Sequence, residues 1–170
     1  MGEALPRIPR WAGVYYAALA VVLFTTGMHV PDGYLSPATC VLLFLLALPF
    51  WVIGIRRTRD TMSARSVPLI ALMAAFSFVI MMFNVPLPGG TTGHAVGAAL
   101  AAIILGPEVA TIAISVALII QAFLFGDGGI LAIGANVFNM AVVIPYASYA
   151  LYQALARGTP VRSSRRLVGA

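Results

Sequence analysis

The chain has 170 residues, of which 61% are hydrophobic and 9% are charged, and its mean hydropathy is +0.99. A soluble domain carries roughly 45–50% apolar and about 25% charged residues. The composition therefore excludes an ordinary soluble domain and predicts an integral membrane protein. The net charge of +5 comes from ten basic residues, all arginine, and in such a chain it indicates cytoplasmic loops rather than a nucleic-acid surface. Cys40 is the one cysteine, so no disulfide framework exists.

Residues 1–27 have the features of a secretory signal: a basic start with Arg7 and Arg10, a short apolar run, and small residues before a junction. We predict that the chain is cut after Gly27. Two alternatives stay open, namely an uncleaved first helix and an over-extended reading frame whose true start is Met28. Cleavage and a late start both expose the same N-terminus, which begins Met28-His29.

Residues 28–156 are predicted to form the membrane domain, an all-α bundle of about five transmembrane helices. The apolar runs cover 38–55, 67–83, 93–105, 109–125 and 130–152. Arginines cluster after the first run and in the tail 157–170, and an excess of arginine marks the cytoplasmic side. The Met28 end is therefore predicted to lie outside and the basic tail inside. Both histidines, Asp32 and Asp127 then fall on the outer side.

The run 93–105 is too short to cross a bilayer. Its 13 residues make a helix of about 20 Å, against a hydrocarbon core of about 30 Å. We therefore expect His94, at the start of this helix, to lie below the outer surface. The preceding loop 84–93 is then expected to dip into the membrane, where irregular backbone is tolerated only if protein or a polar cavity lines it.

A chain that begins Met28-His29 carries a ready-made chelate. The Met28 amine, the deprotonated amide nitrogen of His29 and its ring Nδ1 close fused five- and six-membered rings around one ion. The ring of His94 can fill the fourth position. A planar set of nitrogens favours Cu(II) or Ni(II), and low-spin Co(II) also tolerates it. The alternative is that both histidines are merely solvated or satisfied by neighbouring groups.

Other polar and small residues receive weaker predictions. For four polar residues we predict that they support the metal ligands or the dipping loop, and the alternative is turn formation or helix–helix contact. These residues are Asp32, Asn84, Asn136 and Asn139. For Gln121 we favour helix–helix contact and expect its loss to matter little. Ala71 and Ala75 form a small-residue face that lets another helix approach closely.

Four blocks of the sequence resemble one family. The N-terminal block closely resembles that of the cobalt/nickel substrate-capture components of energy-coupling-factor transporters, the CbiM/NikM type. The blocks are Met28-His29-Val30-Pro31-Asp32-Gly33-Tyr34-Leu35-Ser36-Pro37, Gly89-Gly90-Thr91-Thr92-Gly93-His94, Gln121-Ala122-Phe123-Leu124-Phe125-Gly126-Asp127-Gly128-Gly129 and Gly134-Ala135-Asn136-Val137-Phe138-Asn139-Met140. The resemblance covers roughly 28–152. Family members usually continue for one or more further helices, whereas here a basic tail begins at Arg157.

The resemblance implies that the mature N-terminus inserts into the bundle, where Met28, His29 and His94 hold the ion. It also implies partner proteins, namely a transmembrane coupling subunit, two cytoplasmic ATPase subunits and a small accessory membrane subunit. Ala71 and Ala75 are similar to the family's docking motif for the coupling subunit. The implied setting is a bacterial or archaeal cell membrane, with metal uptake of the kind that serves cobalamin biosynthesis.

We therefore predict a substrate-specific component of an ATP-driven importer that captures Ni(II) or Co(II) from the outer side, with no nucleic-acid partner and no enzymatic activity of its own. Two alternatives belong to other classes. One is an intramembrane metalloenzyme with His29, His94 and Asp127 as ligands, which needs an open zinc position and a catalytic carboxylate. The other is a structural membrane subunit that binds no metal.

Overall fold

The computed structural model describes residues 26–27, 29–61, 63, 66–87 and 91–156. The predicted signal segment up to residue 25, Met28 and the predicted tail 157–170 lie outside these described residues. The helices are α2 (Pro37–Thr61), α3 (Ser66–Met81), α4 (Ala98–Leu105), α5 (Pro107–Ile120), α6 (Ile133–Asn136) and α7 (Ile144–Ala156). Two π-helical segments continue or join them, η1 (Gln121–Phe125) after α5 and η2 (Val137–Val143) between α6 and α7. The strands are β1 (Thr26–Gly27), β2 (Val85–Leu87) and β3 (Thr91–Ala95).

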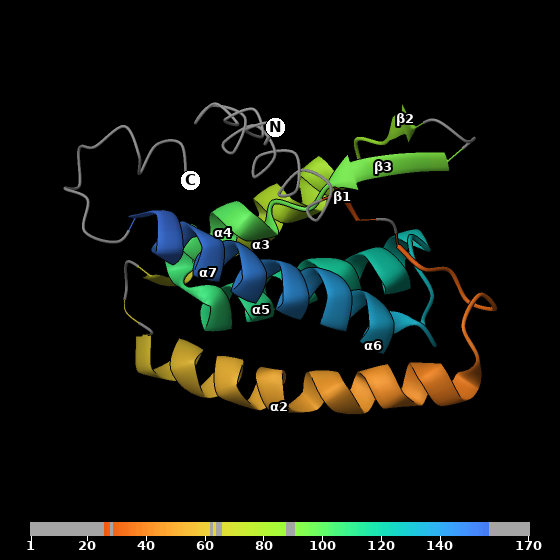
Figure 1. Ribbon diagram of the computed structural model, residues 1–170, viewed down its shortest axis with the longest axis horizontal. Coiled ribbons are helices and arrows are strands. Elements are labelled where there is room, and N and C mark those ends of the chain that lie inside the picture. Colours follow the sequence, from red (N-terminus) through yellow and green to blue (C-terminus); the bar gives the residue numbers. More distant parts are fainter. Residues whose placement is uncertain (1–25, 28, 62, 64–65, 88–90, 157–170) are drawn as a thin grey trace, which may run out of the picture.

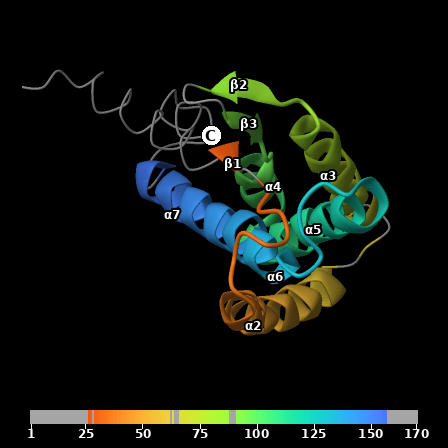
Figure 2. The same cartoon turned by 90° about the vertical axis from the view of Figure 1, so that its right-hand side faces the viewer.

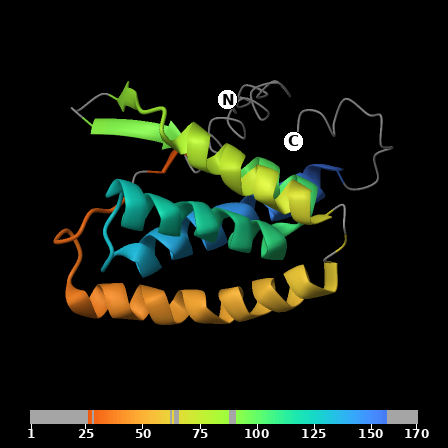
Figure 3. The same ribbon diagram turned by 180° about the vertical axis from the view of Figure 1, so that it is seen from behind.

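Helix α5 occupies the centre of the bundle, with α2, α3, α4 and α7 packed around it (Figure 2). The helices run side by side along one direction (Figures 1 and 3), as expected for a membrane bundle. Alanines dominate the facing surfaces of α4 and α5, including Ala101, Ala110 and Ala117, and such small side chains let helix backbones approach closely. A hydrogen bond of 2.8 Å from Trp51 Nε1 to Ser115 Oγ joins α2 to α5.

Within the described residues, two helical stretches are long and apolar enough to cross a membrane, Pro37–Thr61 and Pro107–Phe125. Helix α3 is also apolar but has 16 residues. Large apolar side chains such as Val41, Leu45 and Ile53 are exposed along α2, which suits contact with lipid rather than water. The predicted predominance of helix is confirmed, whereas the number of five spans stays a prediction.

One predicted helix is placed wrongly. The helix expected over 93–105 begins only at Ala98, and His94 lies on β3. Thr91 and Thr92 are β-branched and favour a strand. Gly97, at φ 74°, then separates the strand from α4. The loop expected to dip irregularly instead contributes the antiparallel pair β2–β3, so the all-α prediction must be corrected to a helical bundle with a small sheet.

The sheet has the order β1-β3-β2 and is antiparallel throughout. Thr26 pairs with Ala95 and Gly27 pairs with His94. Figures 1 and 2 show the sheet at the end of the bundle where the N-terminal loop approaches α2 and where η1 turns into α6. Both predicted histidine ligands belong to this end.

Candidate metal-binding site

His29 and His94 lie face to face in the interior. Their ring centroids are 4.9 Å apart and the ring planes differ by 29°. The exposed fractions are 8% for His29 and 4% for His94. His29 arrives from the loop before α2 and His94 from the inner end of β3, so the structure brings together the two ring ligands that the sequence predicts.

Three nitrogens of this histidine pair have no hydrogen-bond partner in the described part of the chain: His29 Nε2, His94 Nδ1 and His94 Nε2. A buried polar atom without a partner is costly, and coordination of a metal ion would satisfy such a nitrogen. Burial lowers the pKa of both rings. A lowered pKa favours the neutral imidazole, which is the form that binds metals.

Asp127 faces the same histidine from the turn after η1. Its Oδ1 lies 3.3 Å from His29 Nδ1, and its side chain is 35% exposed. The carboxylate works against burial by raising the pKa of His29, although burial has the larger effect. Asp127 therefore lies between the buried pair and the protein surface. Its carboxylate contacts His29 Nδ1, the nitrogen that the predicted chelate uses.

Asn136 holds the chain next to His29. Its Oδ1 accepts a hydrogen bond of 2.8 Å from the Val30 amide, and its Nδ2 donates one of 3.1 Å to the Val30 carbonyl. The Gly129 amide donates a second hydrogen bond, of 3.0 Å, to the same carbonyl. Asn136 thus binds the backbone that carries His29, which is the supporting role that the sequence allowed for it.

Asp32 also fixes this segment, but through the backbone of the opposite loop. Its carboxylate accepts hydrogen bonds from the amides of Ile130, Leu131 and Ala132 at 3.0, 2.9 and 3.1 Å. This places the charge at the start of α6, and no hydrogen bond or ion pair joins Asp32 to either histidine in the described structure. The structure therefore gives Asp32 an anchoring role.

Two glycines let the loop 126–132 approach so closely. A Cβ on Gly129 would lie 2.1 Å from Asp32 Oδ1, which no side chain can tolerate. Gly128 has φ +89°, and a Cβ there would lie 3.2 Å from both His29 and Asn136. The Gly-Gly pair after Asp127 is therefore required by contact with the N-terminal segment.

The remaining polar residues that the sequence singled out differ in their burial. Asn84 and Asn139 are exposed, so neither reaches the buried pair. Gln121 is fully buried, and its amide nitrogen donates a hydrogen bond of 3.4 Å to the Phe78 carbonyl on α3. This is the helix–helix contact that the sequence analysis favoured for it.

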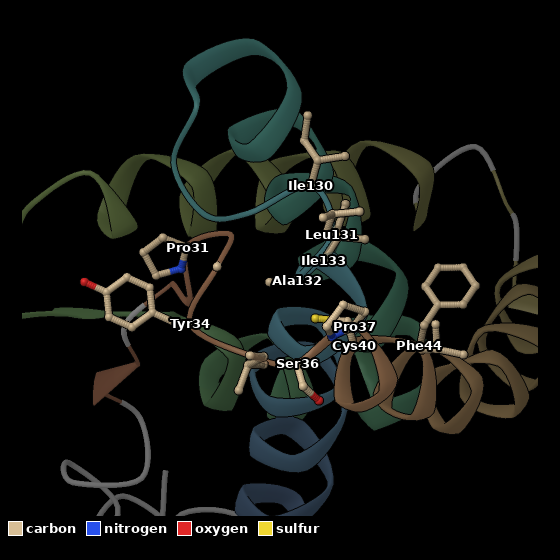
Figure 4. A pocket seen from close by; sticks show the side chains of 13 residues that line it. Pro31, Tyr34, Ser36, Pro37, Cys40, Phe44, Ile130, Leu131, Ala132 and Ile133 are labelled. Atoms are coloured by element: carbon tan, nitrogen blue, oxygen red, sulfur yellow. The ribbon is translucent and has the colours of Figure 1, made fainter.

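A cavity of about 630 Å³ lies next to the loop that follows His29 (Figure 4). Side chains of the N-terminal loop, the first turns of α2 and residues 130–133 line it, among them Tyr34, Phe44 and Leu131. Neither histidine lines it, and its wall is mostly apolar. Such a lining offers few ligands to a cation, so the histidine pair remains the candidate site.

The fold and the site together define a helical membrane protein with a buried pair of histidines at the end of the bundle where its N-terminal segment packs. Comparison with protein families agrees with this class. The model of the cobalt uptake substrate-specific transmembrane region, CbiM, matches residues 29–170, and the chain belongs to this family.

Named relatives are transport proteins. The chain is 55% identical over 141 residues to the fused nickel transport protein NikMN of Rhodobacter capsulatus, covering 83% of this chain and 41% of that protein. It is 33% identical over 158 residues to the cobalt transport protein CbiM of a Roseiflexus species, covering 89% and 64% respectively. A crystal structure of a truncated transition metal transporter matches with a TM-score of 0.76 and 46% identity, covering 84% of this chain and 66% of that one. The chain thus spans between two fifths and two thirds of these relatives.

Proposed function

We propose that this chain captures Ni(II) or Co(II) from the outer side of a bacterial or archaeal cell membrane, as the substrate-specific component of an ATP-driven importer of the energy-coupling-factor type. The observation that carries the proposal is the stacked, buried pair His29–His94, in which neither ring nitrogen of His94 has a hydrogen-bond partner among the described residues. The family and the names of its members support cobalt and nickel as the substrates.

Main-chain nitrogens complete the proposed ligand set. Within the described residues, no group of three or more His, Cys, Asp or Glu side chains is arranged to hold a metal ion. Two imidazoles therefore need further donors, and the backbone is the nearest source. Gly27 pairs with His94 across the sheet. A cut after Gly27 would therefore free the Met28 amine directly after a residue that is held beside the site.

The proposed donors are the Met28 amine, the His29 amide nitrogen, His29 Nδ1 and one ring nitrogen of His94. Four nitrogens in a plane favour Ni(II) over zinc, which prefers a tetrahedral set. Binding through Nδ1 requires that the ion displace the contact with Asp127 Oδ1. The exposed part of that carboxylate makes it a suitable first contact for an entering cation.

The proposed orientation follows from charge. The C-terminal end of α2 carries Arg56, Arg57 and Arg59, which suits the cytoplasmic side. The opposite end of the same helix adjoins the loop that bears His29. An outward-facing site and a topology with five passes agree with this arrangement. Helix α3 has 16 residues and is about 24 Å long, so its flanking residues would complete the crossing.

The proposed partners are a transmembrane coupling subunit, two cytoplasmic ATPase subunits and a small accessory membrane subunit. Energy must then come from the partners, while this chain supplies the substrate site. Helix α3 offers a docking face, because Ala71 and Ala75 are both exposed on it and small residues permit close helix approach.

Metal analysis of the purified chain tests the proposal. Nickel or cobalt near one ion per chain is the expected result for protein that begins at Met28. A variant with one alanine inserted between Gly27 and Met28, cut after Gly27, should lose tight binding because the amine is displaced. Met28→Leu is the matched control and should bind normally, because the chelate uses the amine and not the side chain.

Other outcomes would contradict the proposal. Tight Ni(II) or Co(II) binding by the alanine-extended variant would exclude the N-terminal chelate. Stoichiometric zinc instead of nickel or cobalt would favour the intramembrane metalloenzyme, and protein without any transition metal would favour a structural subunit.

A further inference from the structure

Ser77 joins α3 to the segment that follows the strand of His94. It lies between two methionines on the buried face of α3 and is itself fully buried. A buried hydroxyl in a helix often bonds to the carbonyl four residues earlier, as Thr111 does with the Pro107 carbonyl at 2.9 Å. Ser77 instead donates its hydrogen bond to the Val96 carbonyl, outside its own helix. The hydroxyl therefore links two elements and does not merely satisfy its own helix.

Val96 continues the extended backbone of β3. His94 and Val96 are both buried, whereas Ala95 between them is exposed. This alternation is that of a strand, in which residues two positions apart face the same side. The carbonyl that Ser77 binds is therefore one pleat away from His94, on the stretch of backbone that sets the position of the ring.

A second contact brings α3 close to the same stretch. Gly97 follows Val96 in the left-handed conformation, at φ 74°, and ends the extended run. A Cβ on Gly97 would lie 3.0 Å from Phe76 Cε1, so the glycine allows the Phe76 ring to pack directly against the backbone. Figure 3 shows α3, in yellow-green, running up to the sheet. Phe76 and Ser77 thus hold two successive residues, Val96 and Gly97, from two successive positions of α3.

The pairing of His94 differs in the proposed mature chain. Gly27 on β1 pairs with His94, whereas the pairing of β3 with β2 ends at Gly93. A cut after Gly27 would remove β1 and the pair that it makes with His94. Among the contacts of the described chain, the backbone would then be held at Gly93 by β2 and at the Val96 carbonyl by Ser77. The position of His94 would depend on these two points.

We infer that Ser77 is a positioning residue for the metal site: its hydrogen bond to the Val96 carbonyl fixes the backbone after His94 and so keeps that ring within reach of the ion. The inference rests on the proposed function, because that function removes β1 and uses His94 as a ligand. Ser77 acts through the backbone and is not a ligand itself. The same helix exposes Ala71 and Ala75, so this hydrogen bond also connects the metal site to the helix proposed for docking.

Protein that begins at Met28 and carries Ser77→Ala tests the inference. The affinity for Ni(II), measured by competition with a chelator, should fall by about tenfold. The visible absorption of the bound ion should shift toward that of His94→Ala, because the fourth nitrogen is less well placed. Ser115→Ala is the matched control, since Ser115 is also buried and forms a hydrogen bond between helices, at 2.8 Å from Trp51 Nε1. It should destabilise the fold but leave the affinity and the spectrum unchanged.

A second pair of variants separates the hydroxyl from the size of the side chain. Ser77→Thr and Ser77→Val add side chains of the same shape, and only the first retains a hydroxyl donor. Ser77→Thr should bind Ni(II) about tenfold more tightly than Ser77→Val. Equal affinities in this pair would overturn the inference, as would an unchanged Ni(II) spectrum in Ser77→Ala.

Hydrogen exchange gives a readout that needs no metal. In metal-free protein the amides of residues 93–97 should exchange about tenfold faster in Ser77→Ala than in the unsubstituted chain, and Ser115→Ala should not show this increase. Equal exchange in Ser77→Ala and the unsubstituted chain would exclude the anchoring role. If the unsubstituted chain binds neither Ni(II) nor Co(II), the proposed function fails, while the exchange rates still decide whether Ser77 anchors this strand.

Discussion

Asn136 forms hydrogen bonds with both backbone polar groups of Val30, the residue after His29. A side-chain amide used in this way replaces a neighbouring strand, since it offers one donor and one acceptor to an extended segment. The segment that follows His29 is thereby held against the end of α6, whose last residue is Asn136. The position of the His29 ring depends on this register, because a shift of one residue would turn the ring away from His94.

Removal of the amide should weaken metal binding. Asn136→Leu keeps the approximate size but leaves the part-buried Val30 N–H without its partner, and loss of a partner costs up to about 1–3 kcal/mol when the group is buried. We expect the affinity for Ni(II) to fall by roughly 10- to 100-fold, measured by competition with a chelator of known affinity. Asn139→Leu, the same substitution on the exposed face of η2, is the control. Equal effects of the two substitutions would contradict the role assigned to Asn136.

Loss of the Asp32 charge should destabilise the fold. In Asp32→Asn one carboxylate oxygen becomes an NH₂ group that faces backbone donors from Ile130, Leu131 and Ala132. Hydrogen bonds to a charged group contribute about 1.5–3 kcal/mol, so the thermal midpoint of the metal-free protein should fall clearly. Asp60→Asn, at the exposed opposite end of α2, should leave the midpoint almost unchanged. An unaltered midpoint in Asp32→Asn would show that these hydrogen bonds do not anchor the loop.

The sequence predicted the long helices and the two histidines but not the contacts that bring them together. Apolar runs and arginine clusters locate helices and their ends, because the bilayer imposes both signals. Strand β3 escaped prediction because its five residues, Thr91–Ala95, are too few and include too little apolar surface to show a period of two in the hydropathy. The partners of Asp32 lie in the loop 130–132, far along the chain, and no local pattern encodes them.

Gln121 contacts α3 through the Phe78 carbonyl, as the sequence analysis favoured, but the turn that begins at this residue could not be predicted. A regular α-helical repeat would continue past Ile120, whereas the structure changes to a π-turn at Gln121. This change redirects the residues that follow, including Asp127. Spacing rules based on 3.6 residues per turn therefore cannot place this turn relative to His29.

Acid should destabilise the metal-free protein. Burial lowers the pKa of His29 and His94 below 6.5, so in the range between the folded-state value and 6.5 the unfolded chain binds more protons than the native one. Stability is then lost as the pH falls through 6.5 toward the folded-state pKa, with a slope of at most about 1.4 kcal/mol per pH unit for each histidine. Chemical denaturation in the presence of a chelator, from about pH 8 to about pH 5, measures this slope.

A variant with both histidines replaced by glutamine is the control for this pH dependence. Its stability should vary less with pH over the same range, because glutamine does not titrate. A native chain that became more stable on acidification would contradict the assignment of both rings as buried and neutral.

Helix α3 should couple metal capture to transport through its exposed small residues. Ala71 and Ala75 are exposed one helical turn apart, and a large side chain at either position would hold a partner helix away. We expect Ala75→Phe to abolish uptake of radioactive Ni(II) or Co(II) in cells that contain the proposed partner subunits. The purified variant should bind metal normally, since Ala75 is exposed and is not part of the proposed ligand set. Leu69→Phe, on a different exposed face of α3, is the matched control and should retain uptake. Normal uptake by Ala75→Phe would exclude this face as the docking site, whereas loss of uptake with retained binding separates docking from capture.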